Sequence, residues 1–366
     1  MTEPTTNSPP GLLARVLVVD DSAFMRTALA RMIASESSFE VVATACNGTE
    51  ALEKIAALDP DVVTLDVEMP QLDGLATLRA IMSRFPRPVI MVSATTEQGA
   101  ATTFNALSAG AFDYVPKRLS GTSLDIDHIR HDLIARIRAA ALTRKSPLRD
   151  TKEKKPVHSS RKESRSTVTS ISEIIAIGVS TGGPKALQEI LPGFPRDLAV
   201  PLLIVQHMPE GFSAPFAERL NGVCSITVSE ARQHEIIHPG TAYIAPSGTH
   251  MRVIRRSSDL QPVIALDTSG RSAQYVPSID VLMKSVALLY KSRAMGIIMT
   301  GMGSDGAEGM KAIHRAGGLT IGQDEATCTV YGMPRVCAEM GILDRIVPLS
   351  NIPAQVMQAI LRCRQA

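Results

Sequence analysis

The stretch VLVVDDSAFMR at residues 16–26 places a short β-branched apolar run directly before two aspartates, Asp20 and Asp21. An amphipathic segment follows, and the same alternation repeats as far as about residue 142. Strands that alternate with helices in this way form parallel sheets. The pattern therefore predicts an α/β fold with a doubly wound parallel sheet for residues 15–142. The expected strands are 16–19, 41–45, 62–65, 89–92 and 111–115, and the expected helices are 22–35, 48–58, 75–84, 98–108 and 123–142.

A polar segment separates this domain from a second one. Residues 143–170 hold nine Lys or Arg residues and three acidic residues, with almost no apolar ones. Such a segment cannot bury enough apolar surface to offset the entropy lost on ordering, so we expect a basic polar linker. Its charge leaves contact with an acidic surface or with nucleic acid as an alternative. Residues 1–14 are expected to form a flexible N-terminus.

Residues 171–366 predict a second α/β domain with a doubly wound, mostly parallel sheet. The apolar runs between residues 226 and 266 are too close together for helical crossovers, so we expect an antiparallel excursion there. The expected strands are 174–177, 202–206, 226–228, 241–245, 251–254, 263–266, 296–299, 319–322 and 346–347, with helices from 184 and over 212–220, 278–290, 306–316 and 352–362.

The composition limits the class of protein. With 366 residues, 45% hydrophobic and 20% charged, the chain has the size and composition of two soluble globular domains. A formal net charge of +2 favours neither nucleic acid nor an acidic substrate. The five cysteines include no C-x-x-C pair, so no disulfide framework or zinc knuckle is predicted. The N-terminus is unlike a signal peptide and no apolar stretch is long enough to span a membrane, so we expect a cytoplasmic protein without membrane insertion.

Three carboxylates follow strands of the first predicted sheet. Asp20 and Asp21 end the first strand and Asp66 ends the third, and the carboxyl ends of parallel strands meet at one crevice. A hard divalent ion such as Mg²⁺ would relieve their repulsion. Ser93 and Lys117 follow the fourth and fifth strands and would complete a site for a phosphorylated Asp66. Each aspartate taken alone is more typical of a turn or a helix N-cap, whereas the combination is far less ordinary.

The motifs VLVVDDSAFMR, VVTLDVEMPQLDG, MVSA and FDYVPK together resemble the receiver domains of two-component response regulators. The resemblance implies a flavodoxin-like (βα)5 fold in which Asp66 is phosphorylated and Asp20 and Asp21 bind the metal. It also implies that Ser93, Lys117 and the aromatic Tyr114 sense the phosphoryl group. One departure is that proline precedes Lys117 and arginine follows it, whereas the family usually has proline after the lysine.

The second domain begins with a G-x-S-x-G motif, which places Ser180 on a turn between a strand and a helix. The glycines leave backbone amides free to face developing negative charge. A glycine-rich turn of this kind is also typical of a phosphate cradle or of a tight connection. The motif alone therefore leaves these three interpretations open.

His207 ends the next apolar run, and Asp305 lies in a glycine-rich loop after the run at 296–299. His207 alone is more typical of a hydrogen-bonded structural histidine, and Asp305 could simply cap the helix that follows. Together with Ser180 they would supply a base and an orienting carboxylate at strand ends. The competing residues are His234, His238 and His250 for the base, and Asp267 and Asp280 for the carboxylate.

The motifs IGVSTGGPKAL, VQHMPEGF, YIAPSGTHM, PSIDVLMKSV and MTGMGSDGAEGM resemble the protein-glutamate methylesterase domain of bacterial chemotaxis, and the chain as a whole is similar to the CheB family. The resemblance implies a triad of Ser180, His207 and Asp305, with the Met302 backbone N–H as an oxyanion donor. It also implies that Thr181 and the neighbours of His207 shape the site. It implies demethylation of glutamate γ-methyl esters on chemotaxis receptors, deamidation of receptor glutamines, and activation by phosphorylation in sensory adaptation.

The same resemblance implies Mg²⁺ in the receiver, no cofactor for ester hydrolysis, the histidine kinase CheA as phosphodonor, receptors as substrates, no nucleic acid, and a monomer.

Two other classes compete with this interpretation. The second domain could be a binding module that uses the glycine-rich turn at residues 178–183, or a DNA-binding output domain. The latter lacks a basic recognition helix, because the basic excess lies in the linker.

Overall fold

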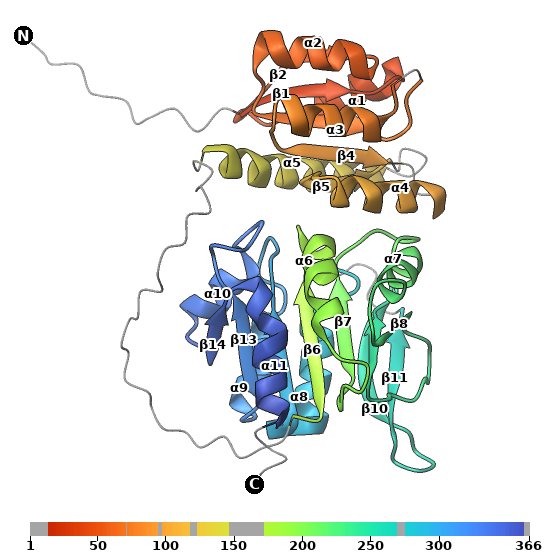
Figure 1. The fold of residues 1–366 in the computed structure, drawn as a ribbon, viewed down its shortest axis with the longest axis vertical. Coiled ribbons are helices and arrows are strands. Elements are labelled where there is room, and N and C mark those ends of the chain that lie inside the picture. Colours follow the sequence, from red (N-terminus) through yellow and green to blue (C-terminus); the bar gives the residue numbers. More distant parts are fainter. Residues whose placement is uncertain are drawn as a thin grey trace, which may run out of the picture. The chain divides into compact units, whose positions relative to one another are not determined.

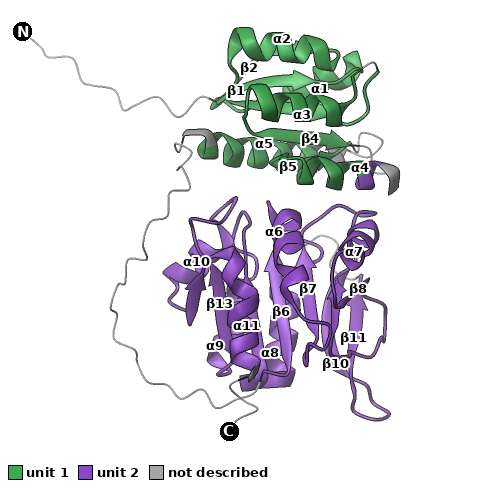
Figure 2. Ribbon diagram, in the orientation of Figure 1, with its two compact units in different colours: residues 1–94, 102–148 green, residues 95–101, 149–366 purple. Residues whose placement is uncertain are grey.

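The structure is a computed structural model that describes residues 14–70, 72–93, 97–117, 123–145, 172–268 and 275–361. The chain divides into two compact units, residues 1–94 with 102–148 and residues 95–101 with 149–366 (Figure 2). The predicted N-terminal segment 1–14 and the predicted linker 143–170 lie almost entirely outside the described residues.

The first unit contains a five-stranded parallel sheet in the order β2-β1-β3-β4-β5 (Figure 1). This order is the doubly wound, flavodoxin-like arrangement, so the predicted fold is confirmed. The strands are β1 Ala14–Val19, β2 Phe39–Ala45, β3 Val62–Asp66, β4 Val89–Ser93 and β5 Asp113–Pro116. The helices are α1 Ala23–Ala34, α2 Gly48–Leu58, α3 Gly74–Arg84, α4 Glu97–Ser108 and α5 Ser123–Lys145.

Local sequence signals explain where the helices of this unit begin. Ser22, Asn47 and Asp73 are the N-caps of α1, α2 and α3, and each side chain accepts a hydrogen bond from a backbone N–H in the first turn. Such caps satisfy amides that have no partner within the helix. Helix α1 packs against α5, and α2 packs against α3, so that the strands are covered on both faces.

The second unit contains a seven-stranded parallel sheet in the order β14-β13-β12-β6-β7-β9-β8, with helices on both faces (Figure 1). Its strands are β6 Ile174–Val179, β7 Leu202–Gln206, β8 Thr227–Glu230, β9 Thr241–Ile244, β12 Ala294–Ile298, β13 Leu319–Gln323 and β14 Arg345–Val347. A separate ribbon pairs β10 His250–Arg255 with β11 Pro262–Asp267. The helices are α6 Gly183–Ile190, α7 Ser213–Asn221, α8 Ile279–Tyr290, α9 Ala307–Arg315, α10 Met333–Glu339 and α11 Ile352–Leu361, with short 3-10 helices at 191–193, 291–293 and 349–351.

The predicted antiparallel excursion is only partly correct. Strands β10 and β11 are antiparallel, but β8 pairs in parallel with β9, which in turn pairs in parallel with β7. The connection at residues 231–240 returns along β8 without a helix. A four-residue strand is about 13 Å long, and ten extended residues reach about 33 Å, so an extended return is long enough. Ile236 in this connection bridges to Val263 of β11.

No helix in the described part of the chain is both long and apolar enough to cross a bilayer. A buried hydrophobic cluster packs against the sheet in each unit. In the second unit the buried cluster includes Ile279, Leu282 and Met283, on the inner face of α8. This packing fixes α8 and its N-terminus relative to the carboxyl ends of the central strands.

Candidate functional site

The three residues predicted to act together follow three neighbouring strands. Strand β6 lies between β12 and β7, with Gly178 opposite Ile298 and Val179 opposite Gln206. Ser180 follows β6 directly and His207 follows β7 directly, whereas Asp305 lies in the loop after β12. Backbone hydrogen bonds continue past the strand ends: His207 N donates to Val179 O at 3.1 Å, and Ser180 N donates to Thr300 O at 3.0 Å. The sheet register therefore brings the three loops together.

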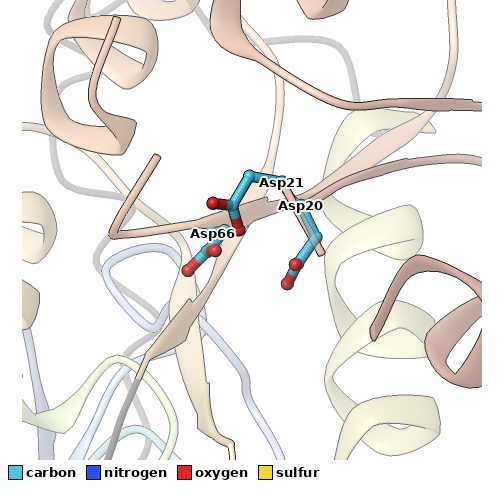
Figure 3. Close-up of side chains that lie close together, drawn as sticks. All are labelled: Asp20, Asp21 and Asp66. Carbon is cyan, nitrogen blue, oxygen red and sulfur yellow. The ribbon is translucent and has the colours of Figure 1, made fainter. Parts of the chain in front are cut away.

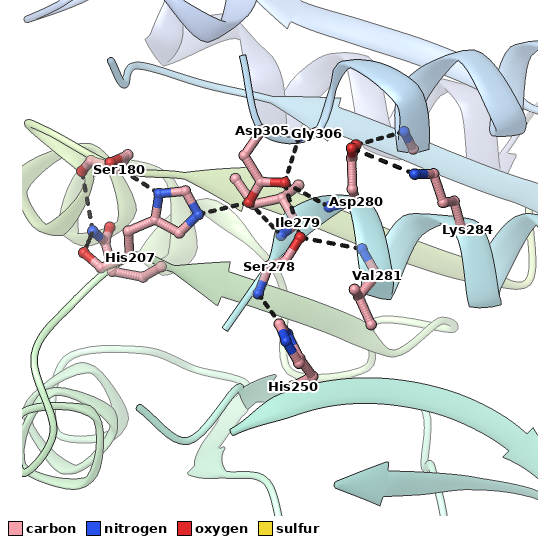
Figure 4. A network of polar contacts seen from close by, with 12 residues as sticks. Ser180, His207, His250, Ser278, Ile279, Asp280, Val281, Lys284, Asp305 and Gly306 are labelled. Carbon is pink, nitrogen blue, oxygen red and sulfur yellow. Dashed lines mark hydrogen bonds and ion pairs between the residues drawn. The ribbon is translucent and has the colours of Figure 1, made fainter. Parts of the chain in front are cut away.

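His207 lies between Ser180 and Asp305 (Figure 4). Its Nδ1 is 3.2 Å from Ser180 Oγ, and its Nε2 is 2.8 Å from Asp305 Oδ2. An ionised carboxylate only accepts hydrogen bonds, so Nε2 carries the proton when the imidazole is neutral. The lone pair of Nδ1 then faces the serine hydroxyl. This arrangement is that of a nucleophile, a base and an orienting acid.

The competing histidines and aspartates lie elsewhere. His250 is buried and its Nδ1 accepts from Ser278 N at 3.2 Å, while His234 and His238 are exposed. Asp267 forms an ion pair with Arg252, and the side chain of Asp280 accepts from Gly309 N at 2.7 Å. His250, Asp267 and Asp280 are thus bound by partners other than Ser180.

Asp305 is held at the N-terminus of α8 by donors on both carboxylate oxygens. Ser278 Oγ donates to Oδ1 at 2.9 Å and Ile279 N donates to Oδ2 at 2.7 Å. Asp280 N and Gly306 N each donate to Oδ1 at 3.1 Å. Burial alone would raise the pKa of Asp305, but the hydrogen bonds from His207 and the backbone amides hold it below its usual value. The carboxyl group is therefore ionised at neutral pH.

Gln206 connects the backbones of the serine and the histidine, a role that sequence reasoning missed. Its side chain is buried, and its Nε2 donates to Ser180 O at 3.0 Å and to His207 O at 2.8 Å. One amide group thus binds the backbone carbonyl groups of both Ser180 and His207. The only sequence signal was a polar residue at the end of an otherwise apolar strand.

Tyr275 is a second residue that the sequence analysis missed. Its ring stacks on the His207 imidazole, with ring centroids 4.5 Å apart and an angle of 4° between the ring planes.

Two glycines lie near Ser180. A Cβ added to Gly301 would lie 2.7 Å from Ser180 Cβ, and Gly182 has a φ of +75°. Both positions require glycine, the first because the loops approach closely and the second because of its left-handed backbone.

The structure places the predicted oxyanion donor, Met302, in the loop between Gly301 and Gly303. Gly301 N donates to Val330 O, and Gly301 O accepts from the backbone N–H groups of Gly332 and Met333. These hydrogen bonds connect this loop to the segment before α10. Within the described ranges, the backbone N–H groups of Met302 and Thr181 have no protein acceptor. Both amides are therefore available to a ligand, and the oxyanion role of Met302 stays a prediction.

The first unit contains the predicted acidic cluster at the ends of β1 and β3 (Figure 3). Ligand atoms of Asp20, Asp21 and Asp66 all lie within 4.8 Å of one another. Lys117 Nζ is 2.8 Å from Asp20 Oδ2 and 2.6 Å from Asp66 Oδ2. Burial raises the pKa of Asp66 to about 6 although Lys117 opposes the shift. Three carboxylates in one crevice are the oxygen ligands that Mg²⁺ prefers, so the residues present fit a divalent cation.

The other predicted receiver residues lie on β4 and β5 or directly after β5. Ser93 is buried at the end of β4, and its carbonyl oxygen accepts from Lys117 N at 2.7 Å. Tyr114 is buried on β5, and burial raises the pKa of its phenol. For Lys117, burial would lower the pKa, but the hydrogen bonds to Asp20 and Asp66 raise it overall, so the side chain stays charged.

Comparisons with known proteins match both units. A family model described as CheB methylesterase matches residues 175–356, and one described as response regulator receiver domain matches residues 16–126. A relative in Nitratidesulfovibrio vulgaris, named protein-glutamate methylesterase/protein-glutamine glutaminase 2, is 45% identical over 95% of this chain and 99% of its own. Relatives named protein-glutamate methylesterase/protein-glutamine glutaminase are 45% identical in Lawsonia intracellularis, over 96% of this chain and 100% of its own, and 42% identical in Bacillus subtilis, over the same shares.

Proposed function

Because the chain belongs to the CheB methylesterase family with an N-terminal receiver domain, we propose that it demethylates glutamate γ-methyl esters on chemotaxis receptors. We propose that phosphorylation controls this activity. The chain is a hydrolase of the protein-glutamate methylesterase/protein-glutamine glutaminase class. The observation that carries the proposed mechanism is the bridge that His207 forms between Ser180 Oγ and Asp305.

In the first half of the reaction, Ser180 Oγ attacks the ester carbonyl carbon while His207 Nδ1 accepts the hydroxyl proton. Asp305 orients the ring and stabilises the imidazolium that forms. The backbone N–H of Met302 donates to the negatively charged oxygen of the tetrahedral intermediate. His207 then returns the proton to the methoxy oxygen, and methanol leaves a glutamyl ester on Ser180.

In the second half, water attacks this ester and His207 accepts a proton from the water. The Ser180 oxygen leaves with that proton, and the glutamic acid formed releases its remaining proton to solvent, which restores a negative charge to the receptor. The same site deamidates receptor glutamines if ammonia takes the place of methanol as the leaving group. Thr181 lies beside the nucleophile with a free backbone N–H, which makes it a second candidate donor to the oxyanion.

In the receiver, we propose that Asp66 accepts a phosphoryl group from the histidine kinase CheA. Asp20, Asp21 and Asp66 would hold Mg²⁺, which when bound would neutralise charge on the transferred group. Ser93 and Lys117 would bind the phosphoryl oxygens, and Tyr114 would respond to the altered loop positions. The charge added at Asp66 biases a two-state receiver toward an active conformation.

We propose that the unphosphorylated receiver inhibits the esterase and that phosphorylation relieves this inhibition. Deletion of residues 1–170 should then raise methanol release above that of the unphosphorylated full-length chain. An isolated second unit that is no faster than the full-length chain would contradict inhibition, and would leave recruitment to receptors as the effect of phosphorylation.

A receptor-binding module without catalysis is the main alternative. The test that separates the two is methanol release from methylated receptor membranes, measured with and without a small phosphodonor and Mg²⁺. An esterase releases methanol in proportion to enzyme and time, whereas a binding module releases none. Absence of methanol release under both conditions would overturn the proposed function.

A further inference from the structure

We propose that Ser278 is a positioning residue for ester hydrolysis, whose hydroxyl holds Asp305 in the orientation in which it binds His207. The inference rests on the proposed esterase function of this site. It concerns a residue that lies outside the predicted triad, at the junction between a loop and the first turn of α8 (Figure 4).

The contacts of Asp305 assign a separate task to each carboxylate oxygen. Oδ2 faces His207 Nε2 at 2.8 Å, whereas Oδ1 accepts from Ser278 Oγ at 2.9 Å. A carboxyl group rotates about its Cβ–Cγ bond unless donors bind both oxygens. The backbone amides of Asp280 and Gly306 also donate to Oδ1, each at 3.1 Å, so the Ser278 hydroxyl is the shortest of three contacts that limit this rotation and keep Oδ2 directed at the imidazole.

The direction of the Ser278 hydrogen bond follows from its other contacts. Ser278 is the N-cap of α8, and its Oγ accepts from Val281 N at 3.4 Å. Ionised Asp305 has no proton to donate, so the hydroxyl proton must lie between Ser278 Oγ and Asp305 Oδ1. The hydroxyl thus accepts from the helix and donates to the carboxylate.

A buried histidine holds Ser278 from the opposite side. His250 Nδ1 accepts from Ser278 N at 3.2 Å, and His250 is 5% exposed. Because Nδ1 is an acceptor, the neutral ring carries its proton on Nε2. The resulting chain of contacts runs from His250 through Ser278 and Asp305 to His207 and Ser180. The contact with His250 fixes the backbone from which the Ser278 hydroxyl projects.

The electrostatic consequence has a definite sign. The Ser278 hydroxyl disperses part of the negative charge of Asp305, so its removal makes the carboxylate attract the imidazolium proton of His207 more strongly. The acid side of the rate profile in Ser278→Ala should therefore lie at higher pH than in the wild type. The other titratable or charged groups around Asp305 in the described residues are His250 at the start of β10 and Asp280 in α8. The carboxylate of Asp280 is already bonded to Gly309 N and paired with Lys284 at 3.5 Å.

The experiment compares four full-length chains in methanol release from methylated receptor membranes: the wild type, Ser278→Ala, Ser278→Thr and Ser285→Ala. Ser285 is the matched control, because its hydroxyl also lies on α8, donates to Leu282 O and accepts from Val253 N, but does not contact Asp305. The readouts are kcat, KM and the pH dependence of kcat/KM.

We expect Ser278→Ala to lower kcat by about tenfold to a hundredfold, as misorientation of reacting groups does, with KM within about twofold of the wild-type value. The acid limb of its kcat/KM profile should move to higher pH. Ser278→Thr keeps a hydroxyl at the same position and should restore both the rate and the profile. Ser285→Ala should retain the wild-type profile.

Wild-type kcat and pH profile in a folded Ser278→Ala chain would overturn the proposal. Equal losses in Ser278→Ala and Ser285→Ala without a shift in the profile would also overturn it, because these indicate a general loss of stability. If Ser278→Ala fails to fold, the Ser278→Thr chain decides: a folded threonine variant with a rate as low as that of Ser180→Ala contradicts the role of the hydroxyl. Absence of methanol release by the wild type is a different outcome, and it would overturn the proposed function together with this inference.

Discussion

His207 presents Nδ1, not Nε2, to Ser180, with 3.2 Å between Nδ1 and Oγ. In the serine-protease triad, the base is Nε2 and the orienting aspartate binds Nδ1, so the ring is reversed here. Nδ1 is the ring nitrogen closer to the backbone, and it reaches the serine because β6 and β7 are adjacent strands with Val179 opposite Gln206. The reversal is thus a result of sheet register.

Replacement of Ser180 by alanine should abolish almost all ester hydrolysis in a folded protein. The change removes the hydroxyl that forms the covalent intermediate and alters little volume. Loss of a triad nucleophile costs several powers of ten in rate. The measurement is methanol release by full-length Ser180→Ala, with circular dichroism as the control for folding. Near wild-type release from the folded variant would refute the role of Ser180.

His207→Ala should match the Ser180→Ala defect, whereas changes at His234 and His238 should have mild effects because both side chains are exposed and make no recorded contact with Ser180. Residues of one catalytic unit are not additive, so the double variant Ser180→Ala/His207→Ala should be about as slow as either single variant. A rate far below both single variants would mean that the two residues act independently.

Gln206→Met should lower kcat by about tenfold or more, because misplaced reacting groups lose rate steeply, and should leave KM almost unchanged. Methionine has a similar length, but it cannot donate to Ser180 O and His207 O. Gln233→Met, at an exposed glutamine on the same unit, is the matched control. The idea fails if both variants keep the wild-type kcat.

A small phosphodonor with Mg²⁺ should raise esterase activity in the wild type but not in Asp66→Ala. Asp66 is buried beside Lys117 and lies within the acidic cluster, so its carboxylate is the group that would carry the phosphoryl charge. Methanol release before and after addition of the phosphodonor gives the comparison. Equal stimulation of both chains would exclude Asp66 as the phosphorylated residue, and stimulation of neither would exclude activation by phosphorylation.

The stability of the second unit should fall as the pH drops below about 6.5, the ordinary pKa of histidine. Burial and then the charge of Arg252 lower the pKa of His250 in the folded chain. The unfolded chain therefore binds a proton at a higher pH than the folded chain, so the stability is complete above pH 6.5 and is lost as the pH falls through the folded pKa.

Differential scanning calorimetry between pH 7 and 5 tests this expectation. His250→Gln keeps an acceptor for Ser278 N and does not titrate, so its transition should shift less with pH than that of the wild type. His238→Gln, at an exposed histidine, serves as the control and should shift as the wild type does. Identical pH dependence in His250→Gln and the wild type would show that His250 does not contribute.

The sheets were predictable from the sequence because their strands are short apolar runs bounded by polar residues. The runs that became β6 and β7 also predicted where Ser180 and His207 lie, since each residue follows its strand directly. The pairing of β8 with β9 was not predictable in the same way. Sequence distance excludes a helical crossover at residues 231–240, but it does not exclude an extended return that leaves the strands parallel.

The residues around the triad were harder to predict because their roles depend on contacts between distant segments. Ser278 has the local signal of an N-cap before α8. This signal does not indicate that the Ser278 hydroxyl also donates to Asp305. Tyr275 stacks on His207, but the two residues are far apart in the sequence and no single motif contains both. Helix α10 was missed although Pro334 lies in its first turn, since seven residues give too little periodicity to detect.

The adjacency of β12, β6 and β7 also limits how the gene can evolve. An in-frame insertion of one codon within β7 would turn His207 toward the opposite face of the sheet, because side chains alternate along a strand. The same insertion in the turn at residues 256–261, between β10 and β11, would leave the sheet register unchanged. The lengths of these three strands are therefore a requirement for the site in addition to the identities of Ser180, His207 and Asp305.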